Sequence, residues 1–275
     1  MIENNPLKQY FRRPAIYIKL PSGCLDYSPA VVEVPESGEL PVYPMTAIDE
    51  ISTKTPDALF NGSAIVDLIK SCVPAIKDPW KISSVDLDAL LIAIRSASNG
   101  NDMEIETECP ACQEVSKYGV NLIGLLSTLK TGDYKTEMKV NDLLLKFRPL
   151  TYKEMTEAGL GQFELQRMFV AINALENVEE KTQKSRDALK TITDITMQVL
   201  SKTIEYIKTP NAFVDQNEYI LDFIQNCDKN VFELIKTHNA ELKVQSEVKP
   251  LKVKCVSCSH EYEQSFTINA ADFFG

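Results

Sequence analysis

Segments in which apolar and polar residues alternate lie on both sides of two Cys-x-x-Cys pairs. Residues 103–108 (MEIETE) and 251–254 (LKVK) alternate in this way, and each leads directly into one of the pairs. After the pairs, residues 115–120 and 262–268 can return as second strands. Alternation with a period of two places every second side chain on the same face of a β-strand. We therefore expect two β-hairpins, each with a cysteine pair at its tip.

Apolar residues at steps of three and four positions predict helices over much of the remaining chain. Residues 86–98 are apolar on more than one face, which indicates a buried helix. Residues 151–240 are expected to be almost wholly helical, with one helix at 163–175 and the longest at 185–207. The residues that share one face of this longest helix are Leu189, Ile192, Thr196, Val199, Thr203 and Ile207.

The remaining predicted strands are short. A proline-rich stretch near the N-terminus allows short strands at residues 31–34 and 40–43. Asn141-Asp142 lies between two apolar segments and is a hairpin signal, although a weaker one than Asn-Gly. Together these patterns predict an α+β fold that is mainly helical, with small β-hairpins.

The two pairs consist of Cys109 and Cys112, and of Cys255 and Cys258, and we interpret them as the ligands of one structural Zn²⁺ ion. Four thiolates satisfy a tetrahedral zinc, and a two-residue gap lets each pair bind the metal from one tight turn. Residues 113–254 separate the pairs, an interval of 142 residues that is too long for a continuous zinc ribbon. The hairpins must therefore belong to one split zinc-ribbon module into which a domain is inserted.

The cysteine pairs have three alternative interpretations. Disulfides are one, although nothing in the sequence suggests secretion and a Cys-x-x-Cys span is strained for an internal bridge. Redox pairs are another, although such pairs stand at a helix N-terminus in a βαβ unit. Two unrelated surface pairs are the third. His260 follows Cys258 closely but would be a surplus ligand, because four cysteines complete the shell.

The zinc interpretation divides the chain into four parts. An extended N-terminal arm with strands comes first, followed by a helical region. The split zinc-ribbon module then encloses a hairpin with a mainly helical insert. The predicted boundaries are, in that order, residues 1–44, 45–100, 101–120 with 249–275, and 121–248.

The composition disfavours several functions. A formal net charge of −10 argues against a nucleic-acid surface, because phosphate binding needs a basic field. No apolar run approaches the roughly 20 residues that span a bilayer, and the first residues lack a secretory apolar region. The sequence contains neither a glycine-rich phosphate loop nor a GxSxG motif. We expect no enzymatic activity and no small-molecule substrate, and we expect Asp67, Asp86 and Asp88 to lie on solvated helix faces.

Both ends of the chain carry candidate partner contacts. The N-terminal segment combines aromatic and basic residues, and it can be either a frayed terminus or an arm that docks on a neighbouring subunit. The apolar C-terminal segment can pack under the zinc ribbon or insert into a partner. The residues concerned are Tyr10, Phe11, Arg12, Arg13, Phe273 and Phe274.

Several motifs resemble a family of phage proteins. FRRPAIYIKLP (residues 11–21), YPMTAIDE (43–50) and KTPDALFNG (54–62) look like the baseplate hub family of contractile-tailed phages of the T-even type. The similarity extends to DLDALLIAIR (86–95), the first cysteine pair and FRPLT (147–151). It is clearest over residues 10–155 and again at the second pair, whereas the helical stretch around 160–240 is generic.

The resemblance implies a non-enzymatic baseplate hub subunit, or a hub-assembly factor, that binds other tail proteins. Such a protein would act in the host cytoplasm during assembly and be part of the virion tail baseplate. Only the four cysteines carry over, as metal ligands. One alternative is a transient chaperone for hub or tape-measure proteins that is absent from the mature virion. Another is a zinc-ribbon nucleic-acid-binding protein, which the acidic residues Glu104, Glu106 and Glu108 beside the first pair disfavour.

Overall fold

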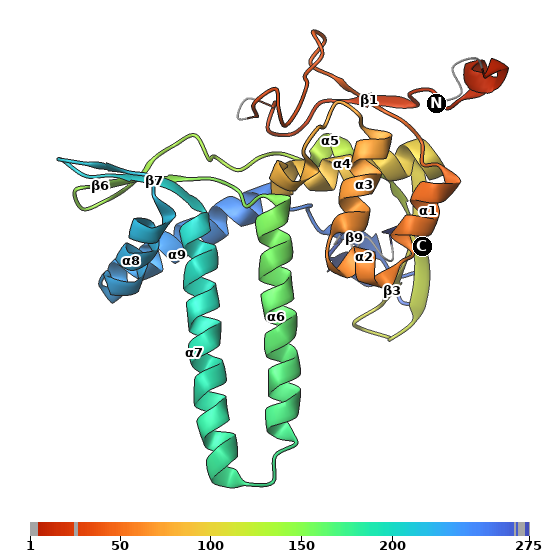
Figure 1. Ribbon diagram of the computed structural model, residues 1–275. Coiled ribbons are helices and arrows are strands. Elements are labelled where there is room, and N and C mark those ends of the chain that lie inside the picture. Colours follow the sequence, from red (N-terminus) through yellow and green to blue (C-terminus); the bar gives the residue numbers. More distant parts are fainter. Residues whose placement is uncertain (1–4, 25–26, 267, 269–272, 275) are drawn as a thin grey trace. The chain divides into compact units, whose positions relative to one another are not determined.

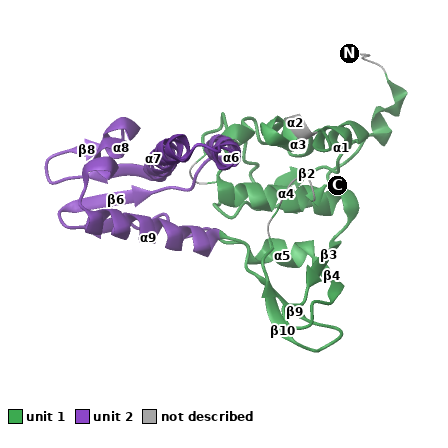
Figure 2. Ribbon diagram, turned by 90° about the horizontal axis from the view of Figure 1, so that it is seen from below, with its two compact units in different colours: residues 1–130, 247–275 green, residues 131–246 purple. Residues whose placement is uncertain are grey.

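The chain forms two compact units, each with its own core (Figure 2). The structure is a computed structural model that describes residues 5–24, 27–266, 268, 273 and 274, without the side chains of Pro56 and Asp57. Unit 1 consists of residues 1–130 and 247–275, and unit 2 of residues 131–246. Helices and small antiparallel sheets occur in both units, which confirms the predicted α+β class.

The first part of unit 1 is built around the buried helix α4 (Ser84–Asn99). The Ser83 side chain begins this helix by accepting a hydrogen bond from the backbone N–H of Asp86, and Gly100, at φ 90°, ends it. Residues on several faces of α4 are buried, as the sequence pattern predicted. The elements that precede it are η1 (Pro6–Tyr10), β1 (Ile16–Ile18), β2 (Leu40–Val42), α1 (Ala47–Thr53), α2 (Pro56–Phe60), α3 (Ser63–Cys72) and η2 (Pro79–Lys81).

Two expectations for this part of the chain are wrong. Residues 31–34 form no strand and contribute a single bridge between Val32 and Ile76. Asp86 does not lie on a solvated face but is fully buried, and Asp88 is half-buried. The carboxylate of Asp86 accepts hydrogen bonds from the hydroxyl of Tyr27 at 2.6 Å and from the backbone N–H of Ser22 at 3.0 Å. These partners come from loops distant in sequence, so the helical pattern alone did not reveal them.

Both predicted cysteine hairpins are present in unit 1 (Figure 2). Strand β3 (Asp102–Glu108) pairs antiparallel with β4 (Val115–Asn121), and β9 (Leu251–Lys254) pairs with β10 (Glu261–Gln264). The last strand ends at Gln264, earlier than the predicted end at residue 268. Helix α5 (Leu122–Thr128) follows β4 directly.

Unit 2 combines a four-stranded antiparallel sheet with helices (Figure 1). The sheet has the order β5-β6-β7-β8, and Asn141 at φ 53° turns the predicted hairpin between its first two strands. The core of the unit includes Phe147, Ile207, Ile220 and Ile235. The elements are β5 (Met138–Val140), β6 (Leu143–Phe147), α6 (Tyr152–Asn173), α7 (Val178–Lys202), β7 (Ile204–Lys208), β8 (Phe213–Val214), α8 (Asn217–Asn226) and α9 (Lys229–Ser246).

The prediction that residues 151–240 are almost wholly helical is wrong at two strands, β7 and β8. The predicted helix at 185–207 ends instead at Lys202, and Ile204–Lys208 forms β7, which pairs with β6. Apolar and polar residues alternate in IEYIK, as in a β-strand. Strand β6, from much earlier in the chain, has a free edge with which this segment can pair. The helix at 163–175 is also not separate, because it is the second half of the continuous helix α6.

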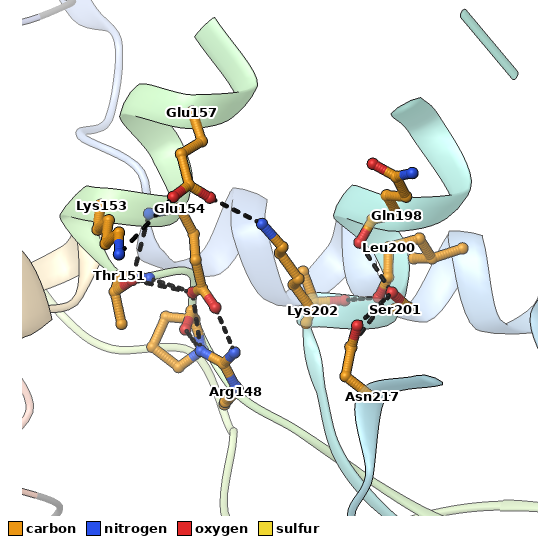
Figure 3. Close-up of polar contacts among 12 residues, drawn as sticks. Arg148, Thr151, Lys153, Glu154, Glu157, Gln198, Leu200, Ser201, Lys202 and Asn217 are labelled. Carbon is orange, nitrogen blue, oxygen red and sulfur yellow. Dashed lines mark hydrogen bonds and ion pairs between the residues drawn. The ribbon is translucent and has the colours of Figure 1, made fainter. Parts of the chain in front are cut away.

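Polar contacts fix the base of the α6–α7 helical hairpin (Figure 3). Arg148 forms a two-pronged ion pair with Glu154, at 2.6 and 2.9 Å, and Glu154 also accepts a hydrogen bond from the backbone N–H of Thr151 at 2.9 Å. Lys202 at the end of α7 pairs with Glu157 of α6 at 2.9 Å. The two helices are therefore joined at the end that enters the sheet.

Candidate metal centre

Four cysteine sulfurs meet in unit 1, two from each hairpin tip. The Sγ atoms of Cys109, Cys112, Cys255 and Cys258 all lie within 4.8 Å of one another. Across the hairpins, Cys109 lies 3.7 Å from Cys258, and Cys112 lies 3.6 Å from Cys255. A tetrahedral zinc with sulfurs at about 2.3 Å would separate these atoms by roughly 3.8 Å. The donor set and its spacing therefore fit one tetrahedral metal ion.

The two hairpin tips have the same backbone geometry. In the first, the N–H of Gln113 donates to the carbonyl of Cys109 at 2.8 Å, and the N–H of Cys109 donates to the carbonyl of Glu114 at 3.0 Å. The second repeats both bonds, with Ser259 donating to Cys255 at 3.0 Å and Cys255 donating to His260 at 2.9 Å. Each pair is thus held by one tight turn.

Gln113 and Ser259 occupy equivalent places, each directly after the second cysteine of its pair. Their φ angles are 62° and 61°, in the left-handed region that glycine adopts most easily. Sequence reasoning missed this requirement, because the usual signal for a left-handed turn is a glycine and neither position has one. The two-fold repetition shows that both tips fold into the same turn.

Contacts between the hairpins support the cluster. The Thr107 hydroxyl donates to the side-chain oxygen of Gln264 at 2.6 Å, and the Tyr118 hydroxyl donates to the carbonyl of Lys254 at 3.1 Å. Within the cluster, Cys109 and Cys255 are buried, whereas Cys112 and Cys258 are exposed. A bound metal would therefore be shielded on one side and reach the surface on the other.

The turn itself favours a thiolate at Cys255. A hydrogen bond from the backbone of Cys258 is the largest influence, and burial opposes it; the resulting pKa of Cys255 is about 7, lower than for an ordinary thiol. The thiolate is the form that binds a metal ion. One of the four ligands is therefore prepared for coordination near neutral pH.

Disulfide, redox and unrelated surface pairs fit this geometry less well than a metal site does. All four cysteines are free thiols, not disulfides. The two pairs come together, so they are not unrelated surface pairs. They lie at hairpin tips, not at the N-terminus of a helix. His260 stacks on Tyr262 with ring centroids 6.2 Å apart and is not part of the cluster.

The candidate partner residues at the two ends differ in their surroundings. Tyr10 and Phe11 are exposed, at 77% and 57%, and Arg13 is exposed as well. Arg12 is half-buried and holds the arm to unit 1: its guanidinium donates to the carbonyl of Ser71 at 2.8 Å and pairs with Asp49 at 3.3 Å.

Phe273 and Phe274 are buried, each with 2% of its surface exposed. Phe273 lies edge-on to Phe266 and beneath the guanidinium of Arg95, which is 5.9 Å from the ring centroid. The structure shows both side chains packed within the chain, which is one of the two alternatives expected for this segment. In this conformation they offer no surface to a partner.

Comparisons with known proteins place the chain in a family. In the described part of the chain, every helix is too short or too polar to span a bilayer. No curated protein and no solved structure matches the sequence significantly. The model of one family, described as "T4 bacteriophage base plate protein", matches residues 14–275, which is nearly the whole chain and includes both cysteine pairs. The protein therefore belongs to the T4 bacteriophage base plate protein family.

Proposed function

We propose that the protein is a non-enzymatic baseplate hub subunit or hub-assembly factor that binds other tail proteins and contains one structural zinc ion. The observation that carries this proposal is the family match over residues 14–275. A baseplate is an assembly of many proteins, so membership in this family supports a role in protein–protein binding. The hub assignment rests on the motifs in residues 11–62.

The cysteine cluster supports a structural metal, not a catalytic one. A catalytic zinc keeps one position open for water or substrate, whereas four thiolates close the shell. Cys109, Cys112, Cys255 and Cys258 would hold the ion, and the ion would join the two hairpins that unit 2 separates in sequence. The chain's own residues would supply binding surfaces, and no catalytic step is assigned to them.

Mass spectrometry of purified phage particles tests the proposal. A hub subunit is expected in gradient-purified virions at a constant ratio to other baseplate proteins. Detection only in lysates of infected cells, and never in particles, would favour the transient chaperone. Co-expression with the other tail proteins, followed by affinity purification through this chain, would then identify the partner. Failure to copurify any tail protein, together with absence from particles, would overturn the proposal.

A further inference from the structure

A groove of about 590 Å³ lies in unit 1 and is lined by residues of β4, α5 and β9. Apolar side chains from each of these elements line it. Val120, Leu125 and Val253 are almost fully buried, and Ile105 and Leu251 are half-buried. A Cβ atom placed on Gly119, which also lines the groove, would meet nothing within 4 Å. The groove therefore combines an apolar lining with open space beside a strand.

Strand β4 has an edge that no described strand covers. Among the described strands it pairs only with β3. Hydrogen bonds at the two ends of this pairing show which residues of β4 bond to β3: the N–H of Leu122 donates to the carbonyl of Asn101, and the N–H of Cys109 donates to the carbonyl of Glu114. In an antiparallel ladder only every second residue directs its N–H and C=O to the partner strand. The main chain of Lys117 and Gly119 consequently points away from β3.

Strand β9 has a matching free edge on the same groove. Cys255 donates to His260, so the residues that bond to β10 are Val253 and Leu251, and the main chain of Lys252 points away from it. The carbonyl of Lys254 also points outward, but the Tyr118 hydroxyl already donates to it. The groove thus lies between two strand edges, each with unused hydrogen-bonding groups in the described part of the chain.

The rim of the groove is basic in an otherwise acidic protein. Lys249, Lys252 and Lys254 all line it, whereas the chain as a whole has a net charge of −10. Lys254 is 3.8 Å from Glu261, but Lys249 and Lys252 form no ion pair with any residue that the structure describes. An occupant that carries carboxylates would complement this rim, whereas a basic one would be repelled.

We propose that this groove binds an extended acidic segment of a partner protein, which adds as a strand to the free edge of β4 or β9. Strand addition supplies main-chain hydrogen bonds, and pockets for alternate side chains supply specificity. A segment with alternating apolar and acidic residues would direct its apolar side chains to Val120 and Val253 and its carboxylates to Lys249 and Lys252. The inference rests on the proposed function as a protein-binding baseplate component and specifies the chemistry of one partner segment.

A synthetic peptide tests the proposal on the full-length, zinc-loaded protein. The probe is a blocked peptide of alternating valine and aspartate, with seven residues to match the length of β4. Isothermal titration calorimetry measures its affinity, and amide hydrogen exchange by NMR reports where it binds. When the peptide is bound, we expect slower exchange of the outward N–H group of Gly119 if it adds to β4, or of Lys252 if it adds to β9. The same peptide with lysine in place of aspartate, or with N-methylated peptide bonds, is expected not to bind measurably.

Charge reversal on the protein provides the second arm. The double variant Lys249→Glu, Lys252→Glu is expected to weaken binding by about tenfold or more, because two ion pairs become repulsive. The double variant Lys190→Glu, Lys229→Glu is the matched control, since it changes the net charge equally at two exposed lysines of unit 2, and it should bind like the wild type. Circular dichroism and zinc content verify that each variant is folded, and the peptide series tests the groove even if the double variant is not.

Besides failure of the peptide to bind, three results would overturn the inference. The first is equal binding of the N-methylated and unmodified peptides, because strand addition requires peptide N–H groups. The second is slower exchange only at residues outside the groove. The third is concentration-dependent protection of Gly119 and Lys252 without any peptide, accompanied by a dimer in sedimentation, which would assign the groove to a second copy of the chain. If the protein is present in virions while the peptide fails to bind, only the groove assignment falls and the proposed function stands.

Discussion

Replacing Cys109 by serine removes one of the four proposed zinc ligands from the buried side of the cluster. The Cys109 side chain is fully buried, and its sulfur lies 3.7 Å from that of Cys258. A serine hydroxyl is nearly isosteric but does not ionise near neutral pH, so it cannot replace the thiolate. The substitution should therefore remove a metal ligand with little change in volume.

The expected magnitude follows from the number of ligands. Structural zinc contributes an apparent free energy of about 10–16 kcal/mol in small peptides, or roughly 2.5–4 kcal/mol for each of four ligands. A loss of about 3 kcal/mol corresponds to a decrease of roughly a hundredfold in zinc affinity. The ion joins two turns separated by 142 residues, and closing a loop of that length costs about 5 kcal/mol of chain entropy. Weakening the metal should therefore also loosen the two hairpins.

Zinc affinity is measured by competition with a chromophoric chelator, and metal content by mass spectrometry after dialysis. Wild-type protein should bind one zinc ion per chain, and Cys109→Ser and Cys255→Ser should each lose zinc or become insoluble. Cys227→Ser is the matched control, because Cys227 lies in unit 2, outside the cluster. Chelator treatment of the wild type should lower the melting temperature in the same direction as the cysteine variants. Normal folding and normal zinc content in both cluster variants would refute the metal site.

Four further variants, at three positions, test other parts of the structure. Gln113→Gly should retain zinc, whereas Gln113→Val should lower the melting temperature, because a β-branched residue at φ 62° is strained by about 1–2 kcal/mol; thermal unfolding measures both. Burial, and secondly Glu247, raise the pKa of Asp88 to about 6, so its ionisation opposes folding as pH rises above about 4. Asp88→Asn should therefore stabilise unit 1 at pH 7.5 by about 1–3 kcal/mol and leave stability unchanged below pH 4, as denaturant titration at the two pH values would show. Burial acts to raise the pKa of Glu154, but hydrogen bonds from Arg148 and Thr151 outweigh burial and lower this pKa. The ionised Glu154 side chain therefore stabilises the fold above the normal carboxyl pKa, and this stabilisation is lost in acid. Glu154→Gln should accordingly destabilise the base of the helical hairpin by about 1–3 kcal/mol at pH 7 and by less in acid, and equal effects at both pH values would contradict the ion-pair explanation.

The sequence alone determined most local elements around the cysteines. The strands next to each pair alternate with a period of two, and the two-residue spacing within each pair is typical of a metal-binding turn, so the hairpins and their tips could be predicted. The buried helix at Ser84–Asn99 and its Ser83 cap could also be predicted from the sequence. These features depend on neighbouring residues only, which is why local patterns sufficed.

Contacts between distant residues decided the rest. Ile204–Lys208 could have continued a helix, but the edge of β6 offered hydrogen bonds that a short peptide alone could not provide, and the segment became a strand. The sequence predicted a surface carboxylate at Asp86, but Ser22 and Tyr27, from loops distant in sequence, donate hydrogen bonds to it in the interior. The left-handed turns at Gln113 and Ser259 could not be predicted, because neither position has a glycine. The surrounding hairpins hold the backbone in this conformation.

The sequence therefore determined which residues can bind a metal ion and where strands, helices and turns form locally. These properties arise from side-chain chemistry and from the spacing of apolar residues, which is two positions in strands and three to four in helices. The sequence also predicted that the four thiols converge, because two Cys-x-x-Cys turns together complete one tetrahedral shell. Only the tertiary structure decided which other distant segments meet: that Phe273 and Phe274 are buried within the chain, and that β4 and β9 leave two free edges beside one groove. Such meetings depend on the packing of the whole chain, and no local pattern encodes them.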